Sequence, residues 1–355
     1  MKEIQIEGKT IGAKHPTYFI ADVAANHDGD IERAKDLIYL CAEAGADAAK
    51  FQHFTADTIV SDKGFKSLGA QQSHQSKWKK SVYDVYQDAS IDLGWTPILK
   101  ETCDKAKITF LTSPYSCDLV DEVDPFLNAY KIGSGDITWL EIVKHIASKN
   151  KPVLLATGAS DSTEVDGAMS VLLHHTEDIV LMQCNTNYTA SLENFKYINL
   201  NVLQEYQKKY PDIILGLSDH TSGHATVLGA VALGARVIEK HFTDDTSREG
   251  PDHKFSMDFN TWKDMVDRTR ELENALGSGV KKVEDNELET VVLQRRAIRA
   301  KRDLVAGEII HESDLECLRP CPKDAVPPYK LHEIIGKTLG TNLQSGDYIK
   351  WKNLK

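Results

Sequence analysis

Short apolar runs alternate along this chain with longer segments in which apolar residues return every three or four positions. The first run covers residues 18–25 and ends in a polar turn. Asp30 is well suited to cap a helix, and apolar positions then repeat at helical spacing until Gly45. A second short run follows at 48–51. The pattern predicts a strand, a helix and a strand, the unit that joins parallel strands by a right-handed crossover.

Six further runs have the length and composition of strands, and helical segments lie between them. They cover 108–111, 129–132, 153–156, 179–184 and the two runs that begin at Ile213 and Arg236. Eight strands that alternate with helices over about 260 residues are what a (β/α)8 TIM barrel requires. A doubly wound open sheet is the alternative, but no glycine-rich nucleotide fingerprint follows the first strand.

Three segments complete the expected barrel. Residues 55–80 are rich in Ser, Gln and Lys and only weakly periodic, so we expect a long loop of the kind that often carries function. Residues 95–105 are expected to be helical. Residues 260–276 are expected to form the last barrel helix, because their apolar side chains fall on one face.

The end of the chain has a different character. Gly277-Ser278-Gly279 breaks the last helix, and a charged stretch follows. Short strand-like runs at 297–299, 308–310 and 348–351 lie between Gly and Pro turns, which predicts a small, mostly β domain that docks on another surface. The predicted division is a barrel domain at 1–283, a linker at 284–295 and the small domain at 296–355.

The composition of the chain limits the classes of partner that it can bind and indicates the compartment in which it works. The chain has 355 residues, 41% of them hydrophobic, and a formal net charge of -11. This charge gives no general attraction to nucleic acid or to anionic membranes. No apolar run reaches the length of a signal peptide or a membrane span, and the six cysteines form no zinc-ligand pairs. We expect a cytoplasmic protein that binds neither nucleic acid nor membrane.

Polar residues gather where the predicted strands end. In a parallel barrel these ends face one mouth, where active sites are found. His220 and His241 end neighbouring strands and would suit a divalent metal ion. Lys50 and Lys131 are costly to bury without an anion, so we expect them to hold a carboxylate and a phosphate. The alternatives are ordinary surface histidines and lysines that are salt-bridged or reach solvent. The residues at these ends are Lys50, Gln52, Ser113, Lys131, Ser134, Asn185, Thr186, Asn187, Ser218, Asp219, His220, Lys240 and His241.

Several segments, in the same order, carry a family resemblance. They are Asn26-His27-Asp28-Gly29, Ala49-Lys50-Phe51-Gln52, Lys131-Ile132-Gly133-Ser134-Gly135, Ser218-Asp219-His220-Thr221, Glu239-Lys240-His241-Phe242-Thr243 and Gly250-Pro251-Asp252. On these motifs the chain resembles the sialic acid synthases, also called nonulosonic acid synthases, over essentially its whole length. Its tail looks like the antifreeze-like (SAF) domain of these enzymes, on Gly307-Glu308, Asp314-Leu315, Arg319-Pro320 and Ile335-Gly336-Lys337.

The resemblance implies a carbon–carbon bond-forming transferase. The family condenses phosphoenolpyruvate with the open-chain aldehyde of an N-acetylated hexose, makes a nine-carbon 3-deoxy-2-keto acid and releases phosphate. By resemblance, His220 and His241 would hold Mn²⁺ or Mg²⁺, which polarises the aldehyde and orients a water molecule. Lys50 and Lys131 would bind the anionic ends of phosphoenolpyruvate.

The resemblance also assigns the remaining site residues. The implied catalytic set is Asp22, Lys50, Lys131, His220 and His241. The implied substrate-binding set is Gln52, Ser113, Tyr115, Ser134, Asp136, Asn185, Thr186, Asn187, Tyr188, Ser218, Asp219, Asp252 and Arg319. In the family, the arginine that matches Arg319 enters the active site of a neighbouring subunit, which implies a domain-swapped homodimer.

Five positions depart from the family pattern. Asp22 and Asp136 stand where the family has glutamate, and each loses one methylene of reach. Ala156, Thr186 and Cys321 replace the usual serine, asparagine and glycine. Our hypothesis is that the metal and phosphoenolpyruvate machinery is retained while the sugar pocket has diverged.

The sequence leaves the acceptor and three other functions open. The sugar is N-acetylmannosamine or a 6-deoxy-diacetamido hexose. A synthase of a seven- or eight-carbon keto acid from a phosphorylated sugar would need a second phosphate site. A catalytically silent sugar-binding scaffold and a metal-dependent hydrolase are the more distant alternatives, and the hydrolase leaves Lys50 and Lys131 unexplained.

Overall fold

The computed structural model describes residues 2–68, 75 and 78–355 of the chain. These residues divide into two compact units, Met1–Gly277 and Ser278–Lys355. The expected linker, 284–295, falls within the second unit, where the 3₁₀ helix η7 (Asp285–Glu287) and α12 (Leu288–Gln294) form. Every helix in the described ranges is too short or too polar to cross a bilayer.

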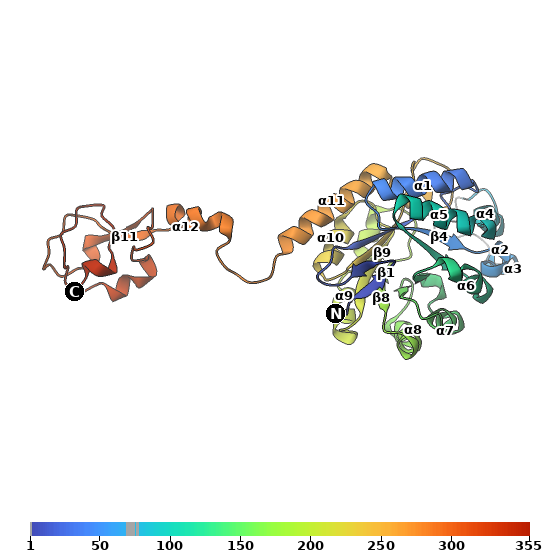
Figure 1. The fold of residues 1–355 in the computed structure, drawn as a ribbon, viewed down its shortest axis with the longest axis horizontal. Coiled ribbons are helices and arrows are strands. Elements are labelled where there is room, and N and C mark those ends of the chain that lie inside the picture. Colours follow the sequence, from blue (N-terminus) through green and yellow to red (C-terminus); the bar gives the residue numbers. More distant parts are fainter. Residues whose placement is uncertain (1, 69–74, 76–77) are drawn as a thin grey trace. The chain divides into compact units, whose positions relative to one another are not determined.

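Eight parallel strands of the first unit form one sheet in the order β5-β4-β3-β10-β9-β8-β7-β6. The two end strands, β5 and β6, also lie beside each other, so the sheet closes on itself. Helices surround its outer face (Figure 1). The (β/α)8 barrel is therefore confirmed, and the open sheet is excluded. The strands are β3 (Tyr18–Asp22), β4 (Ala48–His53), β5 (Thr109–Pro114), β6 (Tyr130–Ile132), β7 (Val153–Ala156), β8 (Ile179–Cys184), β9 (Ile214–Asp219) and β10 (Val237–His241).

Half of the barrel helices begin at a residue whose side chain caps the helix. At the start of α1, the Asp30 carboxylate accepts hydrogen bonds from the backbone N–H groups of Glu32 and Arg33. The α-helices are α1 (Ile31–Glu43), α5 (Thr96–Ala106), α6 (Cys117–Val123), α7 (Leu140–Ala147), α8 (Ser162–His175), α9 (Val202–Lys209), α10 (Ala225–Ala232) and α11 (Phe259–Leu276). Short 3₁₀ helices are η2 (Leu93–Trp95), η3 (Asp124–Phe126), η4 (Ser134–Asp136), η5 (Leu192–Tyr197) and η6 (His253–Phe255).

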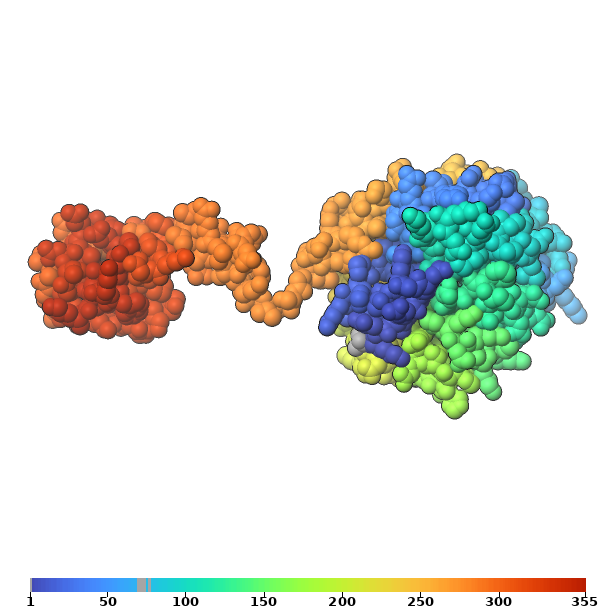
Figure 2. Space-filling model, in the orientation of Figure 1, coloured from blue at the N-terminus to red at the C-terminus, as the bar shows by residue number. Residues whose placement is uncertain are grey.

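Apolar side chains of the first unit form two layers. The outer layer packs the strands against the helices, and the inner layer fills the barrel. An antiparallel hairpin, β1 (Ile4–Ile6) and β2 (Lys9–Ile11), adds Ile4, Ile6 and Ile11 to the inner layer. Figure 2 shows these N-terminal residues, in dark blue, over the face of the barrel that it presents. The sequence analysis missed this hairpin, which covers one end of the barrel and leaves chemistry to the other.

The segment expected to be one long loop, 55–80, contains helices. They are α2 (Ala56–Ile59) and α3 (Asp62–Ser67), and α4 (Val82–Ala89) follows. The loop prediction is wrong for residues 56–59 and 62–67. Ser61 caps α3 by accepting the Gly64 N–H, and helices this short show no apolar periodicity in the sequence. The part of the prediction that falls on residues 69–74, 76 and 77 lies outside the described residues.

The second unit has one regular strand pair. β11 (Ala297–Ala300) pairs antiparallel with β12 (Leu315–Leu318), a strand that the sequence analysis missed. The strands expected at 308–310 and 348–351 are wrong: Ile309 and Tyr348 make isolated bridges, and Trp351 begins a 3₁₀ helix. Turns interrupt the chain of this unit too often for longer strand ladders to form. The 3₁₀ helices are η8 (Glu312–Asp314), η9 (Pro328–Glu333) and η10 (Trp351–Asn353). The unit has its own core, formed by Ile298, Ala300, Leu304, Ile310, Val326, Ile334, Leu339, Leu343 and Ile349.

Candidate active site

The carboxyl ends of the barrel strands surround a cavity of about 410 Å³. This volume lies in the usual range of small-molecule sites, ~300–1,000 Å³. The expected site residues that line it are Asp22, Lys50, Gln52, Ser113, Tyr115, Lys131, Ser134, Asp136, Tyr188, Ser218, His220, His241 and Asp252. Five others are not among its described lining residues, namely Asn185, Thr186, Asn187, Asp219 and Arg319.

Alternation along the strands decides which side chains enter the cavity. Successive residues of a strand point to opposite faces of the sheet. In β10, Val237 belongs to the layer inside the barrel, and Ile238 belongs to the layer under the helices. Glu239 and His241 therefore face inward with Val237, and both line the cavity. Lys240 faces the helices.

Asp219 and Lys240 form an ion pair in the barrel wall. Lys240 Nζ lies 2.5 Å from Asp219 Oδ2, and both side chains are almost fully buried. The hydroxyls of Thr221 and Thr226 donate to the same carboxylate at 2.8 and 2.7 Å. Contrary to our expectation, Asp219 thus stands beside the cavity and not in it, because it follows the inward-facing Ser218. Its pair joins the ends of β9 and β10.

The two cavity lysines are paired with carboxylates of the barrel itself. Lys50 Nζ lies 2.6 Å from Asp22 Oδ2, and Lys131 Nζ lies 3.1 Å from Glu239 Oε1. Lys50 also lies 3.9 Å from Glu239, and Gln52 donates to Asp22 at 3.2 Å. The protein thus supplies its own anions to these lysines. The sequence analysis missed Glu239 as a site residue, although it stands two residues before His241 and so shares its face.

The charges of this network hold one another in place. Burial alone would raise the pKa of Glu239, but Lys131 and Lys50 outweigh it and hold that pKa at about 2. Burial raises the pKa of Asp22 above its ordinary value, against the opposing effect of Lys50. Burial lowers the pKa of Lys50, but Asp22 and Glu239 reverse this and leave it raised. Glu239 is therefore a firmly ionised anchor between the two lysines.

His220 and His241 lie together beside this network, with ring centroids 5.4 Å apart, and His241 Nε2 lies 3.5 Å from Asp22 Oδ2. Burial, together with the other histidine, lowers the pKa of His220 to about 4. Burial and the Lys50 charge lower the pKa of His241 to about 3. Both imidazoles are consequently neutral at pH 7, the form that binds a metal ion.

The two imidazoles also have nitrogens available for a ligand. His220 Nδ1 lies 3.0 Å from the Asn185 carbonyl and can only donate to it, which leaves Nε2 with a free lone pair. His241 Nδ1 is buried without a hydrogen-bond partner among the described residues. These atoms fit a divalent ion. The described residues contain no cluster of three or more His, Cys, Asp or Glu that could hold one, so water or substrate would complete its shell.

Aromatic rings fix the orientation of both imidazoles. The Phe255 ring lies 4.8 Å from that of His241 and 5.8 Å from that of His220. The Tyr188 ring packs on His220 at 4.4 Å and on Phe255 at 5.2 Å. Phe255 was not expected from the sequence, where it is one apolar residue after the Gly250-Pro251-Asp252 motif.

Hydroxyl and carboxyl groups complete the cavity. Ser113 Oγ is buried without a partner among the described residues, whereas Ser218 Oγ donates to Glu239 at 3.2 Å. Ser134 Oγ accepts from the Gly158 N–H at 2.9 Å. Burial raises the pKa of Asp136 to about 6. Burial also raises the pKa of Asp252 to about 7, against the opposing hydrogen bond from Ala25. Two carboxyl groups can thus exchange protons near neutral pH.

The loop after β8 contacts a residue of the cavity, His220. Asn185 gives its carbonyl to His220, and its side-chain amide donates to the Tyr197 carbonyl at 3.3 Å. Asn187 Oδ1 accepts from Asn194 and Thr189. We expected residues 185–187 to contact the substrate, but none of them is among the described residues that line the cavity. Arg319 is an exposed residue of the second unit.

Comparison with known proteins identifies relatives along the whole chain. Residues 37–281 match the NeuB family, and residues 295–355 match the SAF domain. The chain is 35% identical over 353 residues to N,N'-diacetyllegionaminic acid synthase of Legionella pneumophila, covering 98% of this chain and 97% of that protein. It is 33% identical over 341 residues to pseudaminic acid synthase of Campylobacter jejuni, covering 94% of this chain and 95% of that protein.

A solved structure has the same architecture. The crystal structure of N-acetylneuraminic acid synthetase from Leptospira borgpetersenii, in complex with citrate, matches with a TM-score of 0.71 and 26% identity. The match covers 82% of this chain and 95% of that one.

Proposed function

This chain belongs to the NeuB family, the nonulosonic acid synthases, and carries a C-terminal SAF domain, and we propose that it condenses phosphoenolpyruvate with an N-acetylated hexose. The carbon–carbon bond forms between the phosphoenolpyruvate methylene carbon and the open-chain aldehyde. Water adds to the resulting cation, and phosphate leaves, which gives a nine-carbon 3-deoxy-2-keto acid. The protein would then be a transferase.

The observation that carries this proposal is the pairing of two lysines with two neutral imidazoles in one cavity. Lys50 and Lys131 lie within reach of one carboxylate, Glu239, and beside the unpartnered hydroxyl of Ser113. An anionic substrate with a carboxylate and a phosphate can take hydrogen bonds from these groups.

The imidazoles would hold the metal ion on the acceptor side. His220 and His241 would bind a divalent ion, which when present supplies Lewis-acid polarisation of an aldehyde oxygen. Phe255 and Tyr188 keep both rings in place, which preserves the geometry of such a site. Bond formation leaves an alkoxide that needs a proton, and water addition releases one. Asp136 and Asp252 are the cavity carboxyls with a suitable pKa, about 6 and about 7.

The outer part of the cavity mouth suits an acceptor sugar that carries no phosphate group. A second hollow of about 910 Å³ adjoins the first there and shares Ala25 and Tyr188 with it. Of its four lining cations, Lys79, Lys80 and Arg248 each pair with a carboxylate. We propose an uncharged acylated hexose here over the phosphorylated acceptors, because it needs no cation beyond those of these pairs. The names of the legionaminic and pseudaminic acid synthases among the relatives point the same way.

The test is phosphate release from phosphoenolpyruvate with manganese and a panel of acceptors. We expect release with N-acetylmannosamine or a 6-deoxy-diacetamido hexose, a product of matching mass, and no release after chelation. His241→Gln should abolish both turnover and manganese binding. Lys105→Met, an exposed change on α5 that breaks a pair with Glu101 of the same helix, is the control for handling. Silence across the panel would favour a sugar-binding scaffold, and activity without phosphoenolpyruvate would favour a hydrolase.

We also propose that Arg319 reaches the active site of a second subunit in a domain-swapped dimer. Arg319→Ala should then leave folding intact and raise the KM for the sugar. An Arg319→Ala protein that matches the wild type at low sugar concentration, or a wild type that sediments as a monomer, would contradict this arrangement.

A further inference from the structure

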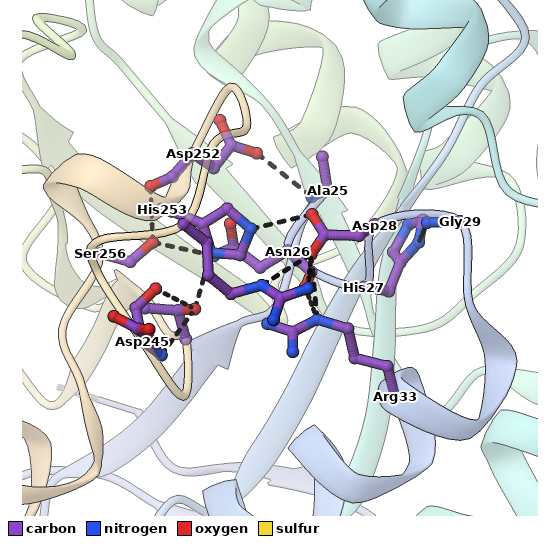
Figure 3. Close-up of polar contacts among 12 residues, drawn as sticks. Ala25, Asn26, His27, Asp28, Gly29, Arg33, Asp245, Asp252, His253 and Ser256 are labelled. Carbon is purple, nitrogen blue, oxygen red and sulfur yellow. Dashed lines mark hydrogen bonds and ion pairs between the residues drawn. The ribbon is translucent and has the colours of Figure 1, made fainter.

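Two loops at the cavity mouth are joined by a network of charged and polar side chains outside the cavity. One loop follows β3 and carries Asp28, and the other lies between β10 and α11 and carries His253 (Figure 3). Asp28 belongs to the motif Asn26-His27-Asp28-Gly29, and His253 directly follows the motif Gly250-Pro251-Asp252. The proposed reaction uses only Asp252 of these motifs, so the role of the others is open.

Asp28 is the centre of the network. Its Oδ1 accepts from His253 Nε2 at 2.9 Å, and its Oδ2 accepts from Arg248 Nε and Nη2 at 3.0 and 2.8 Å. Arg33 Nε lies 3.2 Å from the same Oδ2, and its guanidinium also donates to Asp244. Asp28 holds its carboxylate there from a backbone with φ 53, a conformation that aspartate tolerates better than most residues. Both carboxylate oxygens are therefore used to tie one loop to the other.

His253 is fully buried and uses both ring nitrogens. Its Nδ1 lies 2.7 Å from Thr243 Oγ1, while Nε2 faces Asp28. Because an ionised carboxylate only accepts, Nε2 carries the proton of that hydrogen bond. A Cβ at Gly250 would lie 2.6 Å from His253 Cδ2, so glycine leaves the room that the ring occupies. Two hydrogen bonds and the close approach of Gly250 thus hold the ring in place.

The same short turn carries two groups of the cavity. Asp252 immediately precedes His253, and its Oδ2 accepts from the Ala25 N–H at 3.2 Å, across to the first loop. Phe255 ends η6 and packs on both imidazoles. His253 lies between these two residues in sequence. The contacts that hold its ring therefore also restrain Asp252 and Phe255. His253 and Arg33 line neither hollow of the described structure.

We propose that Asp28 and His253, braced by Arg33 and Arg248, form a positioning set that fixes Asp252 and Phe255 over the cavity for the acceptor sugar. The inference rests on the proposed function. The set acts on the acceptor side because Asp252 and Phe255, the two residues that it positions, lie there. The lysines that would bind phosphoenolpyruvate stand on strands β4 and β6. Disruption should therefore harm acceptor use and spare phosphoenolpyruvate use.

The test compares His253→Phe, which fills the space but makes neither hydrogen bond, with His253→Gln, which keeps an N–H for Asp28. In the full-length protein, His253→Phe should lower kcat/KM for the acceptor roughly 10- to 100-fold, the scale of a small misplacement at a reacting centre, and leave the KM for phosphoenolpyruvate within about twofold. His253→Gln should restore most of the loss. Arg33→Met, which removes a brace of Asp28 and lines neither hollow, should act in the same direction. Arg268→Met, a change of an exposed arginine on α11 with i,i+3 and i,i+4 partners, should not.

Hydrogen exchange of the Ala25 amide supplies a readout that does not need turnover. Its hydrogen bond to Asp252 should protect it in the wild type and be weakened in His253→Phe. Unchanged exchange in His253→Phe would overturn the proposal, as would faster exchange with unaltered acceptor kinetics. A His253→Gln protein as impaired as His253→Phe would also count against it. If the wild type releases no phosphate with any acceptor, the proposed function fails, and the Ala25 exchange alone then decides whether the set positions Asp252.

Discussion

Glu239→Gln is the sharpest test of the charge network at the cavity floor. The substitution keeps the shape of the side chain and the hydrogen bond from Ser218, but it removes the charge that lies 3.1 Å from Lys131 and 3.9 Å from Lys50. The pKa of Glu239 falls from 4.5 to about 2 in the folded protein, as the lysines outweigh the cost of burial. At ~1.4 kcal/mol per pKa unit, the ionised carboxylate stabilises the fold by about 3 kcal/mol.

The pH dependence has a definite sign. Because the folded pKa lies below the ordinary one, the stabilisation is fully present above pH 4.5 and is lost as the pH falls toward 2. We expect the free energy of unfolding of Glu239→Gln to lie about 3 kcal/mol below that of the wild type at pH 7 and at pH 5. Roughly half of that difference should be gone near pH 3.5.

Guanidinium unfolding followed by tryptophan fluorescence measures this difference. Glu205→Gln is the matched control, since Glu205 makes only an exposed pair with Lys208, and we expect it to cost below ~1 kcal/mol at every pH. A Glu239→Gln protein as stable as the wild type at pH 7 would refute the reasoning. So would a loss of stability that stays the same between pH 7 and pH 3.5, because the lost interaction would then not be the charge.

Three further substitutions test other parts of the structure by the same unfolding measurement. Asp136→Asn should stabilise the protein by about 3 kcal/mol at pH 7, since burial raises the pKa of Asp136 from 3.8 to about 6 and its ionisation then costs stability. The gain should shrink as the pH falls from 6 and vanish below pH 3.8, and the substitution should slow catalysis. Lys240→Met should cost about 3–5 kcal/mol, because it leaves the buried Asp219 charge without its lysine, and adding Asp219→Asn should return part of that loss. Gly216→Ala should cost about 1–3 kcal/mol, because its Cβ would lie 2.8 Å from Met182 Cγ and 2.9 Å from the Val237 carbonyl; a tolerated alanine would mean that the barrel interior yields more than its packing indicates.

Local patterns in the sequence predicted most of the barrel. Buried parallel strands appear as short apolar runs, and the expected runs at 153–156 and 179–184 coincide with β7 and β8. Asp30 and the apolar spacing after it predicted α1 to within a residue or so. The second unit was harder, because residues 308–310 and 348–351, which we expected as strands, make isolated bridges to distant segments, and no local period encodes such pairing.

The sequence also determined which residue types stand at the strand ends, and that is enough to predict a mouth with lysines, histidines and hydroxyls. It did not determine which of neighbouring residues enter the cavity. Asp219 was expected inside and stands in the wall, whereas Glu239 was missed and stands between the lysines. The alternation of side chains along a strand tells which residues share a face. It tells which of them enter the cavity only when the face of one residue is already known.

Other features depended on contacts between segments far apart in the chain. The pairing of Asp22 with Lys50, the packing of Phe255 on His220, and the bond of Asp28 to His253 each join different βα units. No local pattern encodes them, because they arise only when the closed sheet brings the ends of its strands to one mouth. Thus the sequence by itself determined the barrel, its second domain and the chemistry of the strand ends. The tertiary structure alone decided which charges meet, since burial and distance set their pKa values and their partners.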